Sequence, residues 1–413
     1  MVPRVSTEAL STLDPERPTG VVGVRQAVCD ASRAVVGYEV LTGDPDAPPT
    51  SARYSARALL EAFTDVDLDL IAPHHPAYLT VGPALLLRMD LLPVAPDRVV
   101  MQLETVDALH EEVVAAVNRL SGLGYVFAAV NPPSPAPVLA LPAIRLVRVD
   151  VSGLDAAAVS ARVSAFIEVG LPVHAFGIAT HDVFEASVDA GCVGFQGPFR
   201  ALPVLTQAPI IESGAMATAA ELLAPDLDFE RLEALIARDL ELSYRLLRYV
   251  NSAFFSRRRE IGTVREAIVL LGERMTRRWA LVVALAGGSP RPDELLFDAL
   301  VRGRAMELLA ESAPGLSADH AFTVGLFSML PSLVNRPMEQ ALDGLGLPTS
   351  IEVALLDGHP PYGPLLDRVI CHLDGDFAER ADDAPGSLDR LDAAYRGALA
   401  WVEKLRGELE RAA

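Results

Sequence analysis

The sequence predicts two folded parts of different class: a (β/α)8 barrel of the TIM type over residues 21–200, and an all-helical bundle over 201–413. Three observations predict this division. Short β-branched segments alternate with helical patterns up to about residue 200. A proline-rich connector, 198–209, follows. Beyond it, apolar residues recur with the helical period of about 3.6 residues. A chain of 413 residues is long enough to bury two cores.

The first part contains a run of short apolar segments that we interpret as the barrel strands. They cover residues 21–28, 35–41, 77–81, 98–103, 125–130, 144–149, 172–177 and 194–196. Helical patterns such as 107–123 and 181–190 lie between them. Strands that alternate with helices in this way favour a parallel sheet covered by helices. The first two segments are close enough to form an antiparallel hairpin, which is a departure from a regular barrel.

The second part shows helix start and stop signals. Asp239 is a plausible N-cap between two amphipathic segments. Thr263 and Glu266 have the spacing of a capping box, and Gly272 is placed to end that helix. A further helix is expected over 274–285, and a last one over 388–409.

Composition excludes several classes of function. The net charge of −20 repels polyanions, so we expect no nucleic acid and no anionic membrane as partners. No apolar run approaches the ~18–20 residues needed to span a bilayer. Residues 1–20 lack the basic and apolar regions of a signal peptide, so we interpret them as a disordered leader on a cytoplasmic protein. The three cysteines are scattered and suggest neither disulfide nor zinc site.

The segment 22–41 resembles the opening hairpin of an EAL domain, a bacterial phosphodiesterase that hydrolyses cyclic di-GMP. The triplet that names the family reads Glu39-Val40-Leu41 here. The segments 239–254 and 261–272 resemble the core of an HDOD domain. Together the chain resembles the bacterial EAL–HDOD signalling proteins, which implies an EAL barrel followed by an HDOD helical bundle.

The resemblance also gives the positions of the family's metal-binding side chains. Several of these positions hold residues that cannot replace the family's acids or asparagine: Thr80, Gln102, Val130, Asn131, Phe176 and Ala179. Two-metal hydrolysis needs several carboxylates that converge on the cations. The positions that keep a family-like side chain are Glu39, Leu41, Glu104, Arg148 (a lysine in the family), Asp150 and Gln196. We interpret these six as vestigial, and we expect no catalytic residue, no metal and no cofactor.

Two further substitutions bear on the ligand. Gly43 stands where the resemblance implies an arginine that contacts the phosphate of cyclic di-GMP. In the helical part, Ser328 and Met329 stand where an HD metal pair would be expected. With no basic residue at position 43 and a net charge of −20, we expect cyclic di-GMP not to be a partner; Ser328 and Met329 predict that the helical part lacks an HD-type metal site.

Arginines concentrate between residues 257 and 278, on an otherwise acidic chain. Arg257, Arg258 and Arg259 open this segment and are our candidates for docking an acidic protein; an internal ion-pair contact with the barrel is the alternative.

The sequence therefore predicts a non-enzymatic signalling adaptor that acts through protein–protein interaction. The resemblance implies kinases, response regulators or cyclic-nucleotide enzymes as partners, with the chain a monomer or homodimer. The alternative is a cyclic di-GMP receptor that binds the nucleotide without hydrolysing it.

Overall fold

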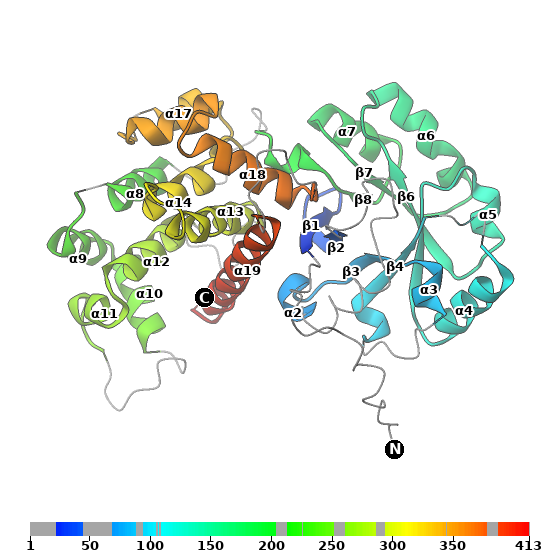
Figure 1. Ribbon diagram of the computed structural model, residues 1–413, viewed down its shortest axis with the longest axis horizontal. Coiled ribbons are helices and arrows are strands. Elements are labelled where there is room, and N and C mark those ends of the chain that lie inside the picture. The colour runs from blue at the N-terminus through cyan, green and yellow to red at the C-terminus, as the bar shows by residue number, and fades with distance from the viewer. Residues whose placement is uncertain are drawn as a thin grey trace, which may run out of the picture.

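The computed structural model describes residues 22–43, 68–87, 94–104, 106, 109–203, 213–224, 226–251, 261–285, 294–343, 345–377 and 387–412. The expected leader, 1–20, and the candidate docking residues Arg257, Arg258 and Arg259 lie outside these ranges. Figure 1 shows the barrel on the right and the helical part on the left.

The first part is a closed barrel whose strands follow one another in chain order. The strands are β1 (Val22–Cys29), β2 (Val35–Gly43), β3 (Ala77–Thr80), β4 (Val99–Leu103), β5 (Val126–Val130), β6 (Ile144–Asp150), β7 (Val173–Phe176) and β8 (Gly194–Phe195). β1 is antiparallel to both β2 and β8, and the other neighbouring strands are parallel. The predicted barrel, with its opening hairpin, is confirmed.

Helices cover the outside of the parallel strands. They are α2 (Leu68–Ile71), α3 (Pro83–Leu86), α4 (Glu111–Gly122), α5 (Pro135–Leu139), α6 (Ala156–Glu168) and α7 (His181–Asp189). Two 3-10 turns, η3 (Pro96–Arg98) and η5 (Pro198–Ala201), complete this part. The Asp155 side chain caps α6 and the Thr180 side chain caps α7, which satisfies otherwise unpaired amides at each helix start.

The second part is helical throughout its described residues. Its helices are α8 (Ser213–Leu223), α9 (Phe229–Arg238), α10 (Leu240–Val250), α11 (Val264–Leu271), α12 (Glu273–Leu285), α13 (Glu294–Glu311), α14 (Ala318–Phe327), α15 (Leu330–Val334), α16 (Met338–Leu342), α17 (Thr349–Asp357), α18 (Gly363–Leu373) and α19 (Ser387–Ala412). The predicted caps are confirmed: Asp239 accepts from the Leu242 amide, and Thr263 accepts from the Glu266 amide.

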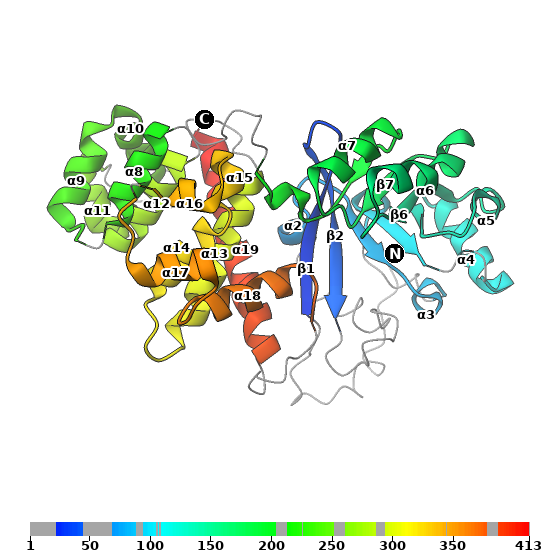
Figure 2. The same ribbon diagram turned by 90° about the horizontal axis from the view of Figure 1, so that it is seen from above.

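The helical part covers the face of the barrel that has no helix of its own. Because β1 connects to β2 by a hairpin, no crossover helix packs on β1; α18 and α19 pack there instead (Figures 1 and 2). The Tyr395 hydroxyl accepts from the Arg25 amide at 3.0 Å, and Asp392 accepts from the Gly23 amide at 3.2 Å. The contact between the two parts is therefore built on backbone groups of β1.

Ion pairs close this contact. The Arg25 guanidinium donates to Glu403 at 2.8 Å and pairs with Glu294 at 3.4 Å, while the Tyr38 hydroxyl donates to Glu294 at 2.8 Å. Arg406 pairs with the other Glu294 oxygen at 2.8 Å. Burial disfavours a charged Glu294, but Arg25 and Arg406 outweigh it and hold the pKa of this carboxyl below its ordinary value.

Candidate functional site at the barrel mouth

The barrel interior holds one layer of four polar side chains from alternate strands. Glu39 lies on β2, Gln102 on β4 and Arg148 on β6, and Gln196 directly follows β8. In barrels of this class, the side chains of one layer come from alternate strands and meet on the axis. Here the layer is polar, whereas the barrel around it is packed with apolar residues.

Arg148 is the centre of this layer. Its guanidinium donates to the two Glu39 oxygens at 2.7 and 3.3 Å and to the side-chain oxygens of Gln102 and Gln196. Only 1% of Arg148 is exposed. A guanidinium offers five donors in a fixed planar arrangement, which suits a ring of acceptors of this kind.

Glu39 is held in its ionised form. Besides Arg148, it accepts from the amide nitrogen of Gln102 at 3.0 Å and from that of Gln196 at 2.6 Å. Burial acts to raise its pKa, but the charge of Arg148 and the hydrogen bonds together hold the pKa of Glu39 below its ordinary value. Glu39 and Arg148 thus form an ion pair without net charge, and most of their polar atoms make hydrogen bonds to each other or to the two glutamines.

Aromatic rings enclose the guanidinium. Arg148 lies 5.0 Å from the ring centre of Phe176 and 5.5 Å from that of Tyr78. Phe176 stands at a position where the resemblance implies an acid, and it stacks on the cation rather than binding a metal. Beneath Tyr78 lies His174, whose pKa is lowered to about 4 by burial and by the charge of Arg148.

The structure brings three of the six vestigial positions together and leaves three apart. Glu39, Arg148 and Gln196 contact one another. Asp150 instead accepts from the Ser152 amide at 2.9 Å and serves the turn after β6. Glu104 is exposed beyond β4, and Leu41 packs half-buried against the core.

Sequence reasoning missed the roles of two glutamines. The sequence comparison marks Gln102 only as a lost acid, although its side-chain amide joins Glu39 to Arg148. Gln26 on β1 accepts from Gln196 at 2.8 Å and extends the network to the side of the barrel that faces the helical part. The signal for Gln26 is a lone amide within an apolar strand segment.

The side chains at the mouth do not fit a pair of metal ions. Glu39 already bonds Arg148 and two amides, and a cation beside it would face the guanidinium charge. Within the described ranges, no three His, Cys, Asp or Glu side chains are grouped closely enough to hold a metal. Phosphodiester hydrolysis through metals therefore finds no ligand set among these residues.

Comparison with known proteins places the chain. An HDOD domain model matches residues 209–341. Cyclic di-GMP phosphodiesterase CdgJ of Vibrio cholerae is 29% identical over 366 residues, which cover 86% of this chain and 85% of CdgJ. The chain is thus similar to the EAL–HDOD proteins, with the HDOD match in its helical part. The uncharacterized protein YuxH of Bacillus subtilis is 22% identical over 400 residues, 92% of this chain and 98% of YuxH.

Two solved structures each resemble less than half of the chain. The PaMucR phosphodiesterase in complex with cyclic di-GMP is 19% identical, covers 43% of this chain and 94% of its own, and has a TM-score of 0.37. Klebsiella pneumoniae BlrP1 with manganese and cyclic di-GMP is 20% identical, covers 45% of this chain and 55% of its own, and has a TM-score of 0.35. The fold rests on the strand order of the barrel and not on these likenesses.

Three expectations from the sequence are wrong in the light of CdgJ. These are the non-enzymatic adaptor (with a receptor as its alternative), the absence of enzymatic activity, and the exclusion of cyclic di-GMP as a partner. A relative that aligns over both parts of the chain is named a cyclic di-GMP phosphodiesterase. The physical reason for the error is that the replaced residues count only against hydrolysis through bound metal, and they do not by themselves exclude enzymatic activity.

The arginines after residue 260 that the structure describes pair within the helical part. Arg274 and Arg278 pair with acids of α13 and α14 inside the helical part, and not with the barrel. Arg265 pairs with Glu233 of α9.

None of the helices that the structure describes combines the length and the apolar character needed to cross a bilayer.

Proposed function

We propose that this protein is a phosphodiesterase whose substrate is cyclic di-GMP. The observation that supports the proposal is the end-to-end similarity to CdgJ, which extends over 86% of this chain and so includes the barrel as well as the HDOD domain. The HDOD match and the similarity to CdgJ also support a role in cyclic di-GMP signalling. Substrate and reaction are taken from the relative, and the barrel mouth is the place to test them.

The mouth supplies an ionised carboxylate, Glu39, and a buried cation, Arg148, in one hydrogen-bonded layer. Since these side chains do not fit a metal pair, the proposal includes no step through bound metal. What they do by themselves is hold the Glu39 charge in a fixed place with the amides of Gln102 and Gln196. Of the two charges, only the Arg148 guanidinium has the sign that stabilises the negative charge developing on a phosphodiester.

The test is turnover of cyclic di-GMP by the purified full-length chain, followed by chromatography of the linear dinucleotide. Parallel reactions contain Mg²⁺, Mn²⁺ or a chelator. We expect linear product above the protein-free control, and a lower rate in the Glu39→Gln variant, which keeps the shape of the side chain and removes its charge. Glu168→Gln, on the exposed side of α6, is the matched control and should keep the wild-type rate.

Two results would count against the proposal. One is a rate that equals the protein-free control under every metal condition. The other is turnover that Glu39→Gln leaves unchanged, since that would place the reaction away from the barrel mouth.

A further inference from the structure

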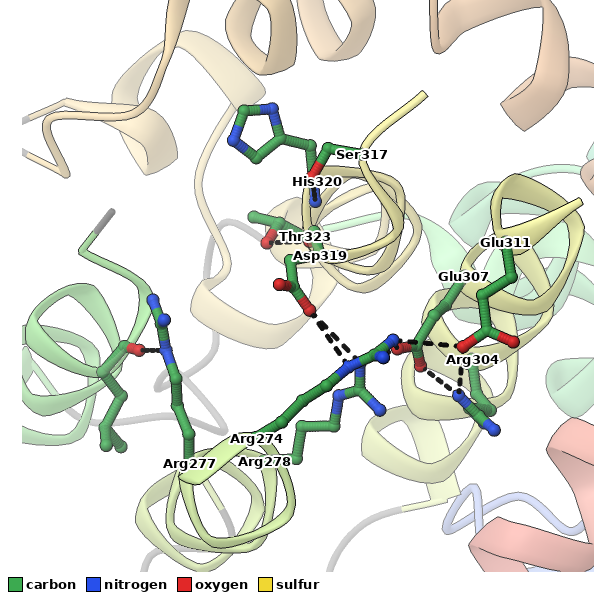
Figure 3. Close-up of polar contacts among 11 residues, drawn as sticks. Arg274, Arg277, Arg278, Arg304, Glu307, Glu311, Ser317, Asp319, His320 and Thr323 are labelled. Atoms are coloured by element: carbon green, nitrogen blue, oxygen red, sulfur yellow. Dashed lines mark hydrogen bonds and ion pairs between the residues drawn. The ribbon is translucent and has the colours of Figure 1, made fainter. Parts of the chain in front are cut away.

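A second cavity lies in the helical part, far along the chain from the barrel site. It has a volume of about 350 Å³ and opens between α12, the start of α14, the start of α17 and the segment that follows α8. Its apolar wall is formed by Leu223, Leu232, Leu281, Phe322, Leu347 and Ile351. The opposite wall carries arginines, which Figure 3 shows with their partners.

Three arginines of α12 reach this cavity: Arg274, Arg277 and Arg278. Their spacing of three and four residues places them on one face of the helix. Arg277 donates to the Leu222 carbonyl and, at 2.7 Å, to the Ala224 carbonyl, so it caps the end of α8 with a positive charge. Burial lowers the pKa of Arg277, and the charge of Asp319 acts against that change.

Two acids of α13, one buried and one exposed, hold the other two arginines from the side away from the cavity. Glu307 of α13 is fully buried and pairs with Arg274 and Arg278, and with Arg304 at 2.5 Å. Glu311 pairs with Arg274 at 3.1 Å. These contacts hold the guanidinium groups in place before any ligand arrives, which lowers the entropic cost of binding one.

On the cavity side, the partner of these arginines is a weakly held carboxylate. Asp319 lies 3.4 Å from Arg274 Nε and 3.3 Å from Arg278 Nη2, and its side chain is 67% exposed. Charge-assisted hydrogen bonds of full strength are about 2.7–2.9 Å long. Asp319 can therefore turn outward into solvent at small cost and leave both guanidinium groups open to another anion.

The start of α14 adds to this preference. Ser317 caps the helix and lines the cavity, together with His320 in the first turn. The positive end of a helix dipole favours an anion at this place. Glu273 at the rim is an opposing charge, but it is exposed. An anion would thus bind by taking the place of Asp319 on the two guanidinium groups. Binding does not depend on a large net positive charge of the cavity.

We propose that this cavity binds a phosphate monoester of mononucleotide size. The phosphate would replace the Asp319 carboxylate on Arg274 and Arg278, with Arg277 as a third cation, since guanidinium groups bind phosphate oxygens in pairs. The base would lie against the apolar wall. A volume of about 350 Å³ is at the lower end of the range of ~300–1,000 Å³ for small-molecule pockets, which favours a mononucleotide over a dinucleotide.

The test is calorimetry of the full-length chain with GMP, inorganic phosphate and guanosine as separate probes. We expect saturable binding of GMP, weaker binding of phosphate, and no binding of guanosine. Arg274→Gln and Arg277→Gln should each weaken GMP binding by about tenfold, the effect of losing one charged hydrogen bond. Arg265→Gln, which removes an equally exposed arginine of α11 outside the cavity, should have no effect.

Asp319→Asn distinguishes a ligand site from a structural ion pair. If Asp319 competes with the ligand, its replacement by asparagine tightens GMP binding severalfold, and circular dichroism verifies that the fold is kept. The proposal is overturned if neither the wild type nor Asp319→Asn binds GMP at millimolar concentration. It is also overturned if GMP binds and both arginine variants leave the affinity unchanged, because the nucleotide then occupies another site.

Discussion

At the scale of single residues, Arg148 determines what the barrel mouth can hold. Its guanidinium keeps its positive charge at any ordinary pH, and it forms an ion pair with Glu39 in the barrel interior. The sequence identifies Arg148 and Glu39 as separate positions. Their pairing depends on the register of the barrel strands, which places the side chains of Glu39 on β2 and Arg148 on β6 in the same layer. The apolar pattern of a single strand does not show this register.

Removing the cation from this layer should be costly. Arg148→Met leaves Glu39 buried without its counter-charge, and breaking a buried pair in this way costs about 3–5 kcal/mol of unfolding free energy. The double variant Arg148→Met with Glu39→Gln removes both charges and should recover part of that loss. Urea unfolding of the single and double variants measures the coupling; strictly additive losses would show that the two charges act independently.

His372 on α18 should make stability depend on pH. Burial lowers its pKa to about 4, and neither ring nitrogen has a hydrogen-bond partner among the residues that the structure describes. Between about pH 6.5 and pH 4 the unfolded chain therefore binds a proton that the folded chain does not, so stability falls as the pH is lowered through this window. From pH 7 to pH 5 this histidine accounts for a loss of about 2 kcal/mol.

His372→Leu tests this assignment. The variant removes the proton and two unsatisfied polar atoms, so it should be at least as stable as the wild type at pH 7 and less sensitive to acid. Thermal midpoints at pH 7, 6 and 5 give the comparison. An unchanged slope in the variant would assign the acid sensitivity to other groups.

At the scale of elements, α13 and α14 approach closely through a pair of glycines. A Cβ on Gly325 would lie 2.7 Å from the Arg302 carbonyl oxygen and 2.7 Å from Gly303 Cα. Both are backbone atoms, which cannot move aside without shifting a helix. The two helices carry Glu307 and Asp319, so their spacing also sets the geometry of the arginine cavity.

Gly325→Ala should therefore destabilise the protein although alanine favours helices. Overpacking of this kind costs about 1–3 kcal/mol. Gly214→Ala on α8 is the control, because a Cβ there meets no atom of the described residues within 4 Å. Chemical denaturation should show a loss for Gly325→Ala and none for Gly214→Ala; equal midpoints would mean that α13 and α14 separate at no cost.

The positions of the strands and the helix starts could be predicted best from the sequence. Every strand segment read from the apolar pattern forms a strand, and Asp239 and Thr263 cap helices as their spacing indicates. These features depend on a few neighbouring residues. The acids that pair with Arg274 and Arg278 were not predicted, because they come from α13 and α14, whose packing the local sequence does not contain.

At the scale of the whole molecule, the two parts behave as one unit because β1 lacks a covering helix. Arg25, Tyr38 and Glu294 lie buried where α13 and α19 meet the hairpin. Sequence patterns give no sign of this contact, since an arginine in a half-buried strand is ordinarily expected at the surface. Gln26, which accepts a hydrogen bond from Gln196, lies on the same side of the barrel and faces the helical part.

Glu294→Ala should weaken the molecule as a whole. It leaves Arg25 and Arg406 without a shared acid, with an expected loss of about 3–5 kcal/mol. Calorimetry of the wild type should show a single transition, and the variant a lower midpoint or a split one. Glu168→Ala on the exposed side of α6 should leave the midpoint nearly unchanged. A variant that melts like the wild type would place the coupling elsewhere.

The central claim is that this chain turns over cyclic di-GMP, and a single-turnover reaction tests it most directly. Full-length protein in excess over labelled cyclic di-GMP, sampled over hours with Mg²⁺, Mn²⁺ or chelator, detects even a slow enzyme because release of product is not required. The account predicts complete conversion of the label to the linear dinucleotide in at least one condition, and a slower conversion with Glu39→Gln. Label that remains cyclic throughout, with protein shown to be folded, would contradict it.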